Sequence, residues 1–240
     1  MTDFDKTNWA RPEFSKQYRD NADIYIVERR RMIEIMRSFY RSHMMNKNRL
    51  VLDLGCGDGI LTGSLLEIDS SISATLIDPS EDMLSKARER LQGSDNVNFI
   101  RASFQDILKV GVLQNDFDFI VSSLAIHHLT TAEKITLYKM IHSHLLPGGQ
   151  FINIDVILAP TDGLEEWYMN LWHEWMNERK AALGLERDLF DDITMRYKAL
   201  EENKPDMLDV QLKALKDAGF MEVDCYYKYG IFTVFGGRKE

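Results

Sequence analysis

The stretch from Leu50 to Gly59, which reads Leu-Val-Leu-Asp-Leu-Gly-Cys-Gly-Asp-Gly, constrains the fold of this chain more than any other part of its sequence. Its apolar first half predicts a buried strand, and an apolar helical pattern begins at Ile60. Glycines occupy alternate positions between them: Gly55, Gly57 and Gly59. Glycine permits backbone angles that other residues avoid and leaves room where a Cβ would block a ligand. A strand, a glycine-rich turn and a helix start together predict a ligand seat at the edge of an open α/β sheet.

Strand and helix patterns alternate over residues 50–155, as a doubly wound α/β sheet requires. Strands are predicted near residues 50–54, 73–78, 97–101, 117–122 and 149–156. Helices are predicted near residues 60–68, 80–92 and 131–145. The turn Pro147-Gly148-Gly149 leads into the fifth strand. The alternation therefore predicts a mostly parallel sheet with helices on both faces.

A second motif lies at the end of the second predicted strand, where Asp78 is followed by Pro79 and a helix start. An acid in this place can accept hydrogen bonds from both hydroxyls of a ribose. Four features resemble motifs of the class I S-adenosylmethionine (SAM) methyltransferases. They are the G-x-G-x-G spacing, the acid Asp78, the L-x-P-G-G sequence at 145–149 and the L-x-x-A-G-F sequence at 215–220. The resemblance covers residues 50–155 with specific motifs and 205–238 with weaker ones.

This resemblance implies SAM as the cofactor and S-adenosylhomocysteine (SAH) as its product. It also implies a seven-stranded sheet whose last strand is antiparallel, with a hairpin at Gly230 between strands near 221–228 and 230–236. Ser103 stands where relatives carry an acid that binds adenine, so its hydroxyl and the backbone N–H of Phe104 are expected to do so, while Asp106 is expected to cap a helix or lie at the rim. The expected cofactor-binding residues are Asp53, Gly55, Cys56, Gly57, Gly59, Asp78, Pro79, Met83, Ser103, Phe104, Ser123 and Leu124.

The composition limits the size and the partners of the protein. With 240 residues, 45% of them hydrophobic, the chain can form one core, predicted as a SAM-binding domain over 50–240 with an N-terminal helical cap over 1–49 and a helical insertion near 157–204. The net charge of -9 disfavours a broad nucleic-acid or anionic-membrane surface. The chain has only two cysteines, its first residues lack the pattern of a secretion signal, and it contains no long apolar run. We therefore expect a cytoplasmic protein. We expect no direct nucleic-acid or membrane partner, and either a monomer or a homodimer.

Two amphipathic stretches outside the alternating core are expected to select the substrate and to form a lid. Residues 14–45 predict a helix with one apolar face, beside which Arg29–Arg31 form either a solvated charge run or an anion contact. Residues 163–203 predict a long helix with an aromatic face and a second helical stretch near 187–202. Such a face usually packs against a neighbour, and over the cofactor it would form an apolar lid. The expected substrate-binding residues are Tyr18, Tyr25, Trp167 and Trp172.

The paired histidines His127 and His128 follow the fourth strand, at the edge where open α/β sheets bind their ligands. An imidazole titrates near neutral pH, so both are predicted as catalytic residues that orient or deprotonate the acceptor. The alternative is structural, with one ring packed under the next helix and the other capping it near Thr130. No cysteine pair or H-x-x-x-H pattern accompanies them, so no metal is expected.

These observations favour an enzyme that transfers a methyl group from SAM to a small, largely apolar or weakly basic acceptor. The N-terminal helices, the paired histidines and the helical insertion also resemble the carboxy-SAM synthases of tRNA wobble modification, which are the first alternative. A carboxylate would need a basic partner, and the candidates are Arg29–Arg31, Arg179, Arg187 and Arg196. The second alternative is a SAM-binding protein without catalytic activity.

Overall fold

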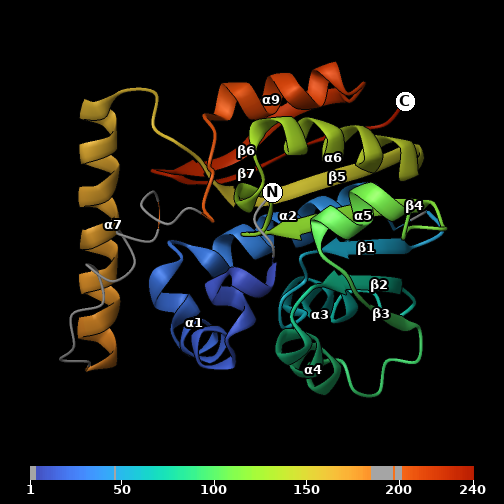
Figure 1. The fold of residues 1–240 in the computed structure, drawn as a ribbon, viewed down its shortest axis with the longest axis horizontal. Helices are drawn as coiled ribbons and strands as arrows, with labels where there is room; N and C mark the ends of the chain where they lie inside the picture. Colours follow the sequence, from blue (N-terminus) through green and yellow to red (C-terminus); the bar gives the residue numbers. More distant parts are fainter. Residues whose placement is uncertain (1–3, 46, 185–196, 198–201) are drawn as a thin grey trace.

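The computed structural model describes residues 4–45, 47–184, 197 and 202–240, and its centre is a single twisted sheet (Figure 1). The strands of this described part are β1 (Leu50–Leu54), β2 (Ser73–Asp78), β3 (Val97–Arg101), β4 (Phe117–Ser123), β5 (Leu145–Val156), β6 (Met221–Tyr229) and β7 (Phe232–Arg238). They form a 7-stranded sheet in the order β3-β2-β1-β4-β5-β7-β6. All neighbours pair in parallel except β7, which is antiparallel to both β5 and β6. The predicted fold class is confirmed.

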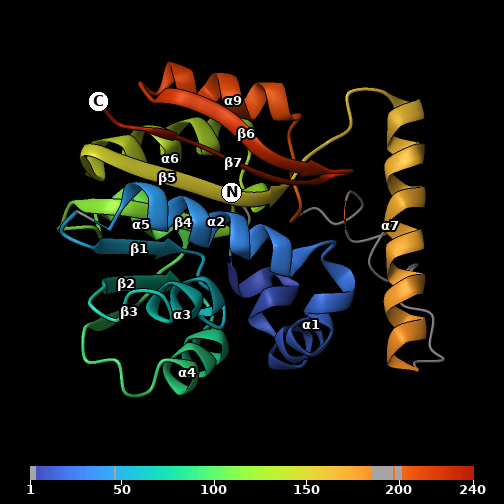
Figure 2. The ribbon, with the colours of Figure 1, turned by 180° about the vertical axis from the view of Figure 1, so that it is seen from behind.

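Helices cover both faces of the sheet, as the strand–helix alternation predicts. One face carries α5 (Phe104–Val110), α6 (Thr131–His144) and α9 (Leu208–Asp217), and the other carries α2 (Arg29–His43), α3 (Ile60–Leu66) and α4 (Glu81–Arg90) (Figure 2). Alternate residues of one strand supply the two cores, because successive side chains of a strand point to opposite faces. In β1, Val51 packs with the α2–α4 face and Leu52 with the α5–α9 face. The short helix α5 was not predicted.

The N-terminal segment is more divided than the sequence suggests. Residues 14–45 were predicted as one helix, but the structure has η1 (Phe4–Lys6), η2 (Asn8–Ala10), α1 (Pro12–Tyr25) and α2. The break falls between Tyr25 and Arg29, where Glu28 takes a left-handed backbone with φ 51°. Helix α2 then buries Met32 and Tyr40 against the sheet, so only the segment up to α1 lies beside the strand ends.

The insertion after β5 begins as the long helix α7 (Asp162–Leu183), which stands at the end of the sheet next to α1 (Figure 1). The two helices are joined by the indole Nε1–H of Trp172, which donates to the carbonyl oxygen of Tyr25 at 2.8 Å. The second helical stretch predicted near 187–202 falls largely outside the described residues. Among the described helices, none combines the length and apolar character that crossing a bilayer demands.

Candidate active site

The crevice between β1 and β4 is the point where the strand order of the sheet reverses, and α/β folds bind their ligands at this point. The glycine loop leaves β1 there with φ values of 66° at Gly55, 52° at Gly57 and 73° at Gly59. A Cβ on Gly55 would collide with the methyl group of Ala125, so this position requires glycine. A Cβ on Gly59 would lie 3.1 Å from that of Ala87, so this glycine serves the packing of α3 against α4.

Asp78, at the end of β2, connects the glycine loop to the start of α4. Its Oδ2 accepts a hydrogen bond from the backbone N–H of Gly57, and its Oδ1 accepts one from that of Ser80, each at 2.9 Å. Burial raises the pKa of this carboxyl to about 6, although both backbone bonds act to lower it. A carboxylate has about four acceptor positions, so two remain for ribose hydroxyls.

These residues border a cavity that we name the cofactor cavity. Its volume is about 880 Å³ when the space at its open entrance is included. Its size falls within the range of small-molecule sites. The predicted cofactor residues that line it are Gly55, Gly57, Asp78, Pro79, Met83, Ser103, Phe104, Ser123 and Leu124. The sequence missed its wall from the N-terminal segment, which includes Phe4, Thr7 and Trp9.

Three predicted cofactor residues do not line this cavity. Asp53 is buried beneath the loop, where its Oδ2 accepts from the Thr62 hydroxyl at 2.7 Å and burial raises its pKa to about 7. Cys56 is also buried, which raises the pKa of its thiol well above the usual value. Gly59 packs against α4, as described above. A role in shaping the loop replaces the predicted direct contact for each of them.

Ser103 and Asp106 form a capping box at the start of α5. The Ser103 hydroxyl donates to Asp106 Oδ2 at 2.6 Å and accepts from the backbone N–H of Asp106 at 3.1 Å. The predicted capping role of Asp106 is therefore confirmed. Because the Ser103 hydroxyl is already engaged, adenine recognition by the Phe104 backbone N–H is the better supported part of that prediction.

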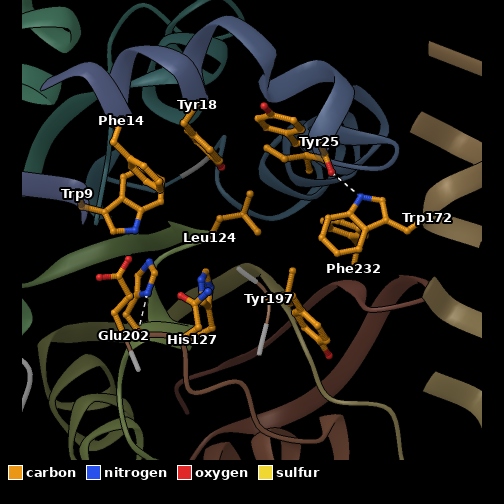
Figure 3. A pocket seen from close by; sticks show the side chains of 14 residues that line it. Trp9, Phe14, Tyr18, Tyr25, Leu124, His127, Trp172, Tyr197, Glu202 and Phe232 are labelled. Carbon is orange, nitrogen blue, oxygen red and sulfur yellow. Dashed lines mark hydrogen bonds between the residues drawn. The ribbon is translucent and has the colours of Figure 1, made fainter. Parts of the chain in front are cut away.

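A second cavity, about 660 Å³ with its open mouth, continues from the first one and is named the aromatic cavity (Figure 3). The rings that line it belong to Trp9, Phe14, Tyr18, Tyr25, Trp172, Tyr197 and Phe232. The two cavities share a wall made of Trp9, Tyr18, Leu124, His128 and Glu202. Leu124 stands between them in a left-handed conformation with φ 50°, held by its backbone N–H, which donates to Ile154 O at 2.8 Å.

The predicted substrate residues Tyr18, Tyr25 and Trp172 line the aromatic cavity. Trp167 does not: its side chain is 54% exposed on the outer face of α7, and it lines neither cavity. The aromatic face of α7 is wider than the stripe that the helix buries, which is Tyr168, Trp172 and Met176, so a substrate contact of Trp167 stays a prediction without a cavity beside it. Arg29 and Arg30 also lie outside both cavities, where they pair with Asp23.

His127 and His128 both reach the aromatic cavity, and their ring centroids are 4.1 Å apart. His127 donates from Nδ1 to Asp155 Oδ1 at 2.6 Å, because an ionised carboxylate can only accept. His128 donates from Nδ1 to the backbone carbonyl oxygen of Glu202 at 3.1 Å, because a carbonyl oxygen likewise can only accept. Each ring in its neutral form therefore has an unprotonated Nε2. The predicted helix-capping alternative is not observed, because Thr130 caps α6.

The surroundings of His128 and Asp155 lower the pKa of both groups, for different reasons. Burial and the neighbouring His127 lower the pKa of His128 to about 3, so its ring stays neutral at physiological pH. Burial alone would raise the pKa of Asp155, but the charge and hydrogen bond of His127 outweigh it and hold that pKa below its ordinary value. Within the described ranges, no three His, Cys, Asp or Glu side chains converge as a metal site would require.

Asp155 and Glu202 are the acidic groups that sequence reasoning missed. An acid within the apolar strand Phe-Ile-Asn-Ile-Asp-Val was a usable signal for Asp155, since buried acids need partners. Glu202 gave no such signal, because only the fold brings it beside Asn8 and His128.

The α/β fold and the cavity at the switch point of its sheet are those of an enzyme class that binds its ligands at the strand ends, and the comparisons with known proteins name the family. A family model described as a methyltransferase domain matches residues 51–149. An uncharacterized methyltransferase of Geobacillus sp. (strain WCH70) is 33% identical over 208 residues, which cover 87% of this chain and 86% of that protein. The carboxy-S-adenosyl-L-methionine synthase of Desulforapulum autotrophicum is 23% identical over 96% of this chain and 89% of the synthase.

Solved structures share the fold. The magnesium protoporphyrin IX methyltransferase of Synechocystis PCC 6803 with bound SAH has a TM-score of 0.63 at 15% identity, covering 97% of this chain and 96% of that one. An O-methyltransferase family protein of Burkholderia thailandensis has a TM-score of 0.64 at 14% identity, covering 98% of this chain but only 63% of that longer one. The chain belongs to the class I SAM-dependent methyltransferases, and SAM is its cofactor.

Proposed function

We propose that this methyltransferase acts on a small, largely apolar or weakly basic organic molecule bound in the aromatic cavity. The observation that carries the proposal is the shared wall of the two cavities, formed by Trp9, Tyr18, Leu124, His128 and Glu202. A molecule in the aromatic cavity would lie next to the cofactor, because only these shared residues stand between the two cavities. Aromatic linings of this kind favour flat or apolar ligands.

The residues of the cofactor cavity fit SAM. Gly57 has open space where a Cβ would stand, and Asp78 retains acceptor positions for ribose hydroxyls. Bound SAM supplies a methyl group already activated by the positively charged sulfur. The protein then has to bind both molecules, hold them in line and exclude water, which can supply about 7–11 kcal/mol of a reaction barrier.

His127 is the group best placed to hold a proton from the acceptor. Its Nδ1 is fixed by Asp155, which leaves the Nε2 lone pair of a cavity-lining ring. A base is needed when the nucleophile is a hydroxyl or a protonated amine, and is dispensable for a neutral amine. We therefore propose His127 as the proton acceptor and His128 as a neutral wall residue that orients the acceptor.

The test is methyl transfer from SAM labelled on its methyl group to a panel of small amines, phenols and thiols, with the products identified by mass spectrometry. Transfer to a panel member that is lost in His127→Ala, while SAH binding persists, supports the proposal. A protein that binds SAH and methylates none of these classes contradicts it.

Synthesis of carboxy-SAM is the second candidate, favoured by the match to the Desulforapulum synthase over 96% of this chain. Against it, no Lys or Arg occurs among the described residues that line either cavity, and a carboxylate ligand normally has such a partner. Arg187 and Arg196 fall outside the described residues. Formation of a carboxylated SAM, detected by mass spectrometry after incubation with small keto acids, would favour this candidate.

A further inference from the structure

Glu202 is an acid in an aromatic environment. Its side chain is buried and lines both cavities, facing Trp9 across the end of the aromatic cavity (Figure 3). Both of its carboxylate oxygens accept from Asn8: Oε2 from the backbone N–H at 3.1 Å and Oε1 from the side-chain amide at 3.2 Å. These donors are neutral, and about two acceptor positions of the carboxylate remain for a ligand.

The two histidines of the aromatic cavity are also acceptors. His127 and His128 each use Nδ1–H on a fixed oxygen, so Nε2 of each neutral ring offers only a lone pair. The indole N–H of Trp172 donates to the carbonyl oxygen of Tyr25, and the hydroxyl of Tyr197 donates to that of Ile157. A ligand that brings several N–H donors can therefore bond to the Glu202 carboxylate and to Nε2 of either histidine.

The charge of the lining points the same way. The described residues that line the two cavities include Glu202 and Asp78 and include neither lysine nor arginine. The rings of Trp9, Phe14 and Tyr18 cluster beside this acid, with Trp9 5.0 Å from Phe14 and 4.9 Å from Tyr18 between centroids. The faces of aromatic rings attract cations, most strongly where water is excluded.

We infer that the methyl acceptor carries a positively charged nitrogen, an amine or a related organic cation, which binds between the Glu202 carboxylate and the ring of Trp9. The inference rests on the proposed function, since it names the substrate class of the same cavity. The remaining rings would then hold an apolar body attached to that nitrogen. A carboxylate or phosphate ligand would instead meet Glu202 with like charge and without a basic partner among the described residues that line the two cavities.

The experiment compares three probes of similar shape on protein saturated with SAH: phenethylamine, phenethyl alcohol and hydrocinnamate. Calorimetric titration at pH 7 should show the amine binding about tenfold more tightly than the alcohol, and the carboxylate binding least. Because binding is measured without turnover, this result stands apart from the methyl-transfer assay of the proposed function. An amine that binds no better than the alcohol overturns the inference and leaves that function open.

The matched variant is Glu202→Gln, which keeps the size of the side chain and removes its charge. It should weaken amine binding about tenfold, leave alcohol binding unchanged and keep the affinity for SAH within about twofold. Glu89→Gln is the control, since this exposed acid on α4 pairs with Lys86 and lines neither cavity, and the charge change is the same. If Glu202→Gln loses SAH affinity as strongly as amine affinity, Glu202 serves the cofactor and the inference is wrong.

Discussion

One carboxylate, that of Asp155, holds both the ring and the backbone of His127. The His127 Nδ1 lies 2.6 Å from Asp155 Oδ1, and the His127 backbone N–H donates to Oδ2 at 3.0 Å. Asp155 is the penultimate residue of β5 and His127 belongs to η3 (Ile126–His128), which follows β4, so the pair joins two neighbouring strand ends. Such a partner fixes the tautomer and the orientation of an imidazole. Asp155 is therefore a positioning residue for the proposed proton acceptor.

Replacing this acid tests the pair. Asp155→Asn should lower kcat by about 10- to 100-fold, because the amide no longer favours the Nδ1–H tautomer, while SAH affinity changes little. Steady-state kinetics with the best acceptor of the panel and calorimetry with SAH measure the two quantities. The double variant with His127→Ala should be no slower than His127→Ala alone. Losses in kcat that multiply would show that Asp155 acts without His127.

Replacement by alanine should have different effects at Gly57 and at Gly55. A Cβ on Gly57 meets nothing within 4 Å and enters the cofactor cavity, so Gly57→Ala should weaken SAH binding at least about tenfold with a loss of stability of only about 1–2 kcal/mol. In Gly55→Ala the Cβ collides with Ala125, so the loss of stability should be larger.

Gly93→Ala is the control for these variants. Gly93 has φ 92° and also has open space around its Cβ position, but it lies outside the cofactor cavity. It should lose stability through backbone strain and keep full SAH affinity. Equal SAH affinity in Gly57→Ala and Gly93→Ala would contradict the placement of the cofactor.

Asp78→Asn should weaken SAH binding by about 10- to 100-fold, since charge-assisted hydrogen bonds to ribose hydroxyls are worth about 1.5–3 kcal/mol each. Asp217→Asn provides the matched loss of charge, because this exposed acid on α9 pairs with Lys213 and does not line the cofactor cavity. Calorimetry with SAH compares the two. An Asp78→Asn protein with the affinity of the wild type would remove the ribose assignment.

Binding of SAH should protect the N-terminal segment from proteolysis. Phe4, Thr7 and Trp9 line the cofactor cavity, so a bound ligand packs against them and opposes their local opening. Limited proteolysis with and without SAH, followed by mass spectrometry, should show slower cleavage before α1 and an unchanged pattern in the core. Equal cleavage in both conditions would argue for a rigid wall instead of a lid.

The sheet could be predicted from the sequence because each strand and turn has a local signal. The apolar run before Gly55, the acid at Asp78 and the hairpin at Gly230 each depend on neighbours a few residues away. The cofactor cavity follows from these, since parallel strands end at one edge of the sheet. The largest shift of a strand boundary is that of β5, which begins at Leu145 because this residue pairs with Phe117 of β4 before the register shifts and pairing resumes at Gln150.

The acceptor side of the site could not be predicted in this way. Trp9 and Glu202 come from segments far apart in the sequence, and the fold brings both of them to the edge where β4 ends. The break between α1 and α2 depends on a left-handed residue, Glu28, that no glycine or proline marks. The exposure of Trp167 could not be predicted, because helical periodicity gives the face of a helix but not how much of that face a neighbour covers.

The buried acid Asp53 should make the stability of the protein depend on pH between about 4 and 7. Its pKa is about 7 in the folded chain against 3.8 when exposed, since burial disfavours the charge. Between these values the folded state keeps a proton that the unfolded state has released, so stability falls as pH rises and then levels off above 7. Asp78, with a pKa of about 6, acts in the same direction up to that pH. His128 acts in the opposite direction below 6.5, because its folded pKa of about 3 is lowered.

Asp53→Asn isolates the contribution of this one carboxyl, because Asp78 and His128 stay the same in both proteins. The amide can still accept the hydrogen bond from Thr62, whose hydroxyl donates to Asp53 Oδ2 in the wild type. The variant should gain thermal stability relative to the wild type as pH rises from 5 to 8, by about 2–4 °C in Tm for each kcal/mol. Calorimetric scans at pH 5, 6, 7 and 8 without ligand measure this difference. A gap in Tm that stays constant over these pH values would show that Asp53 is already ionised in the folded protein at pH 5.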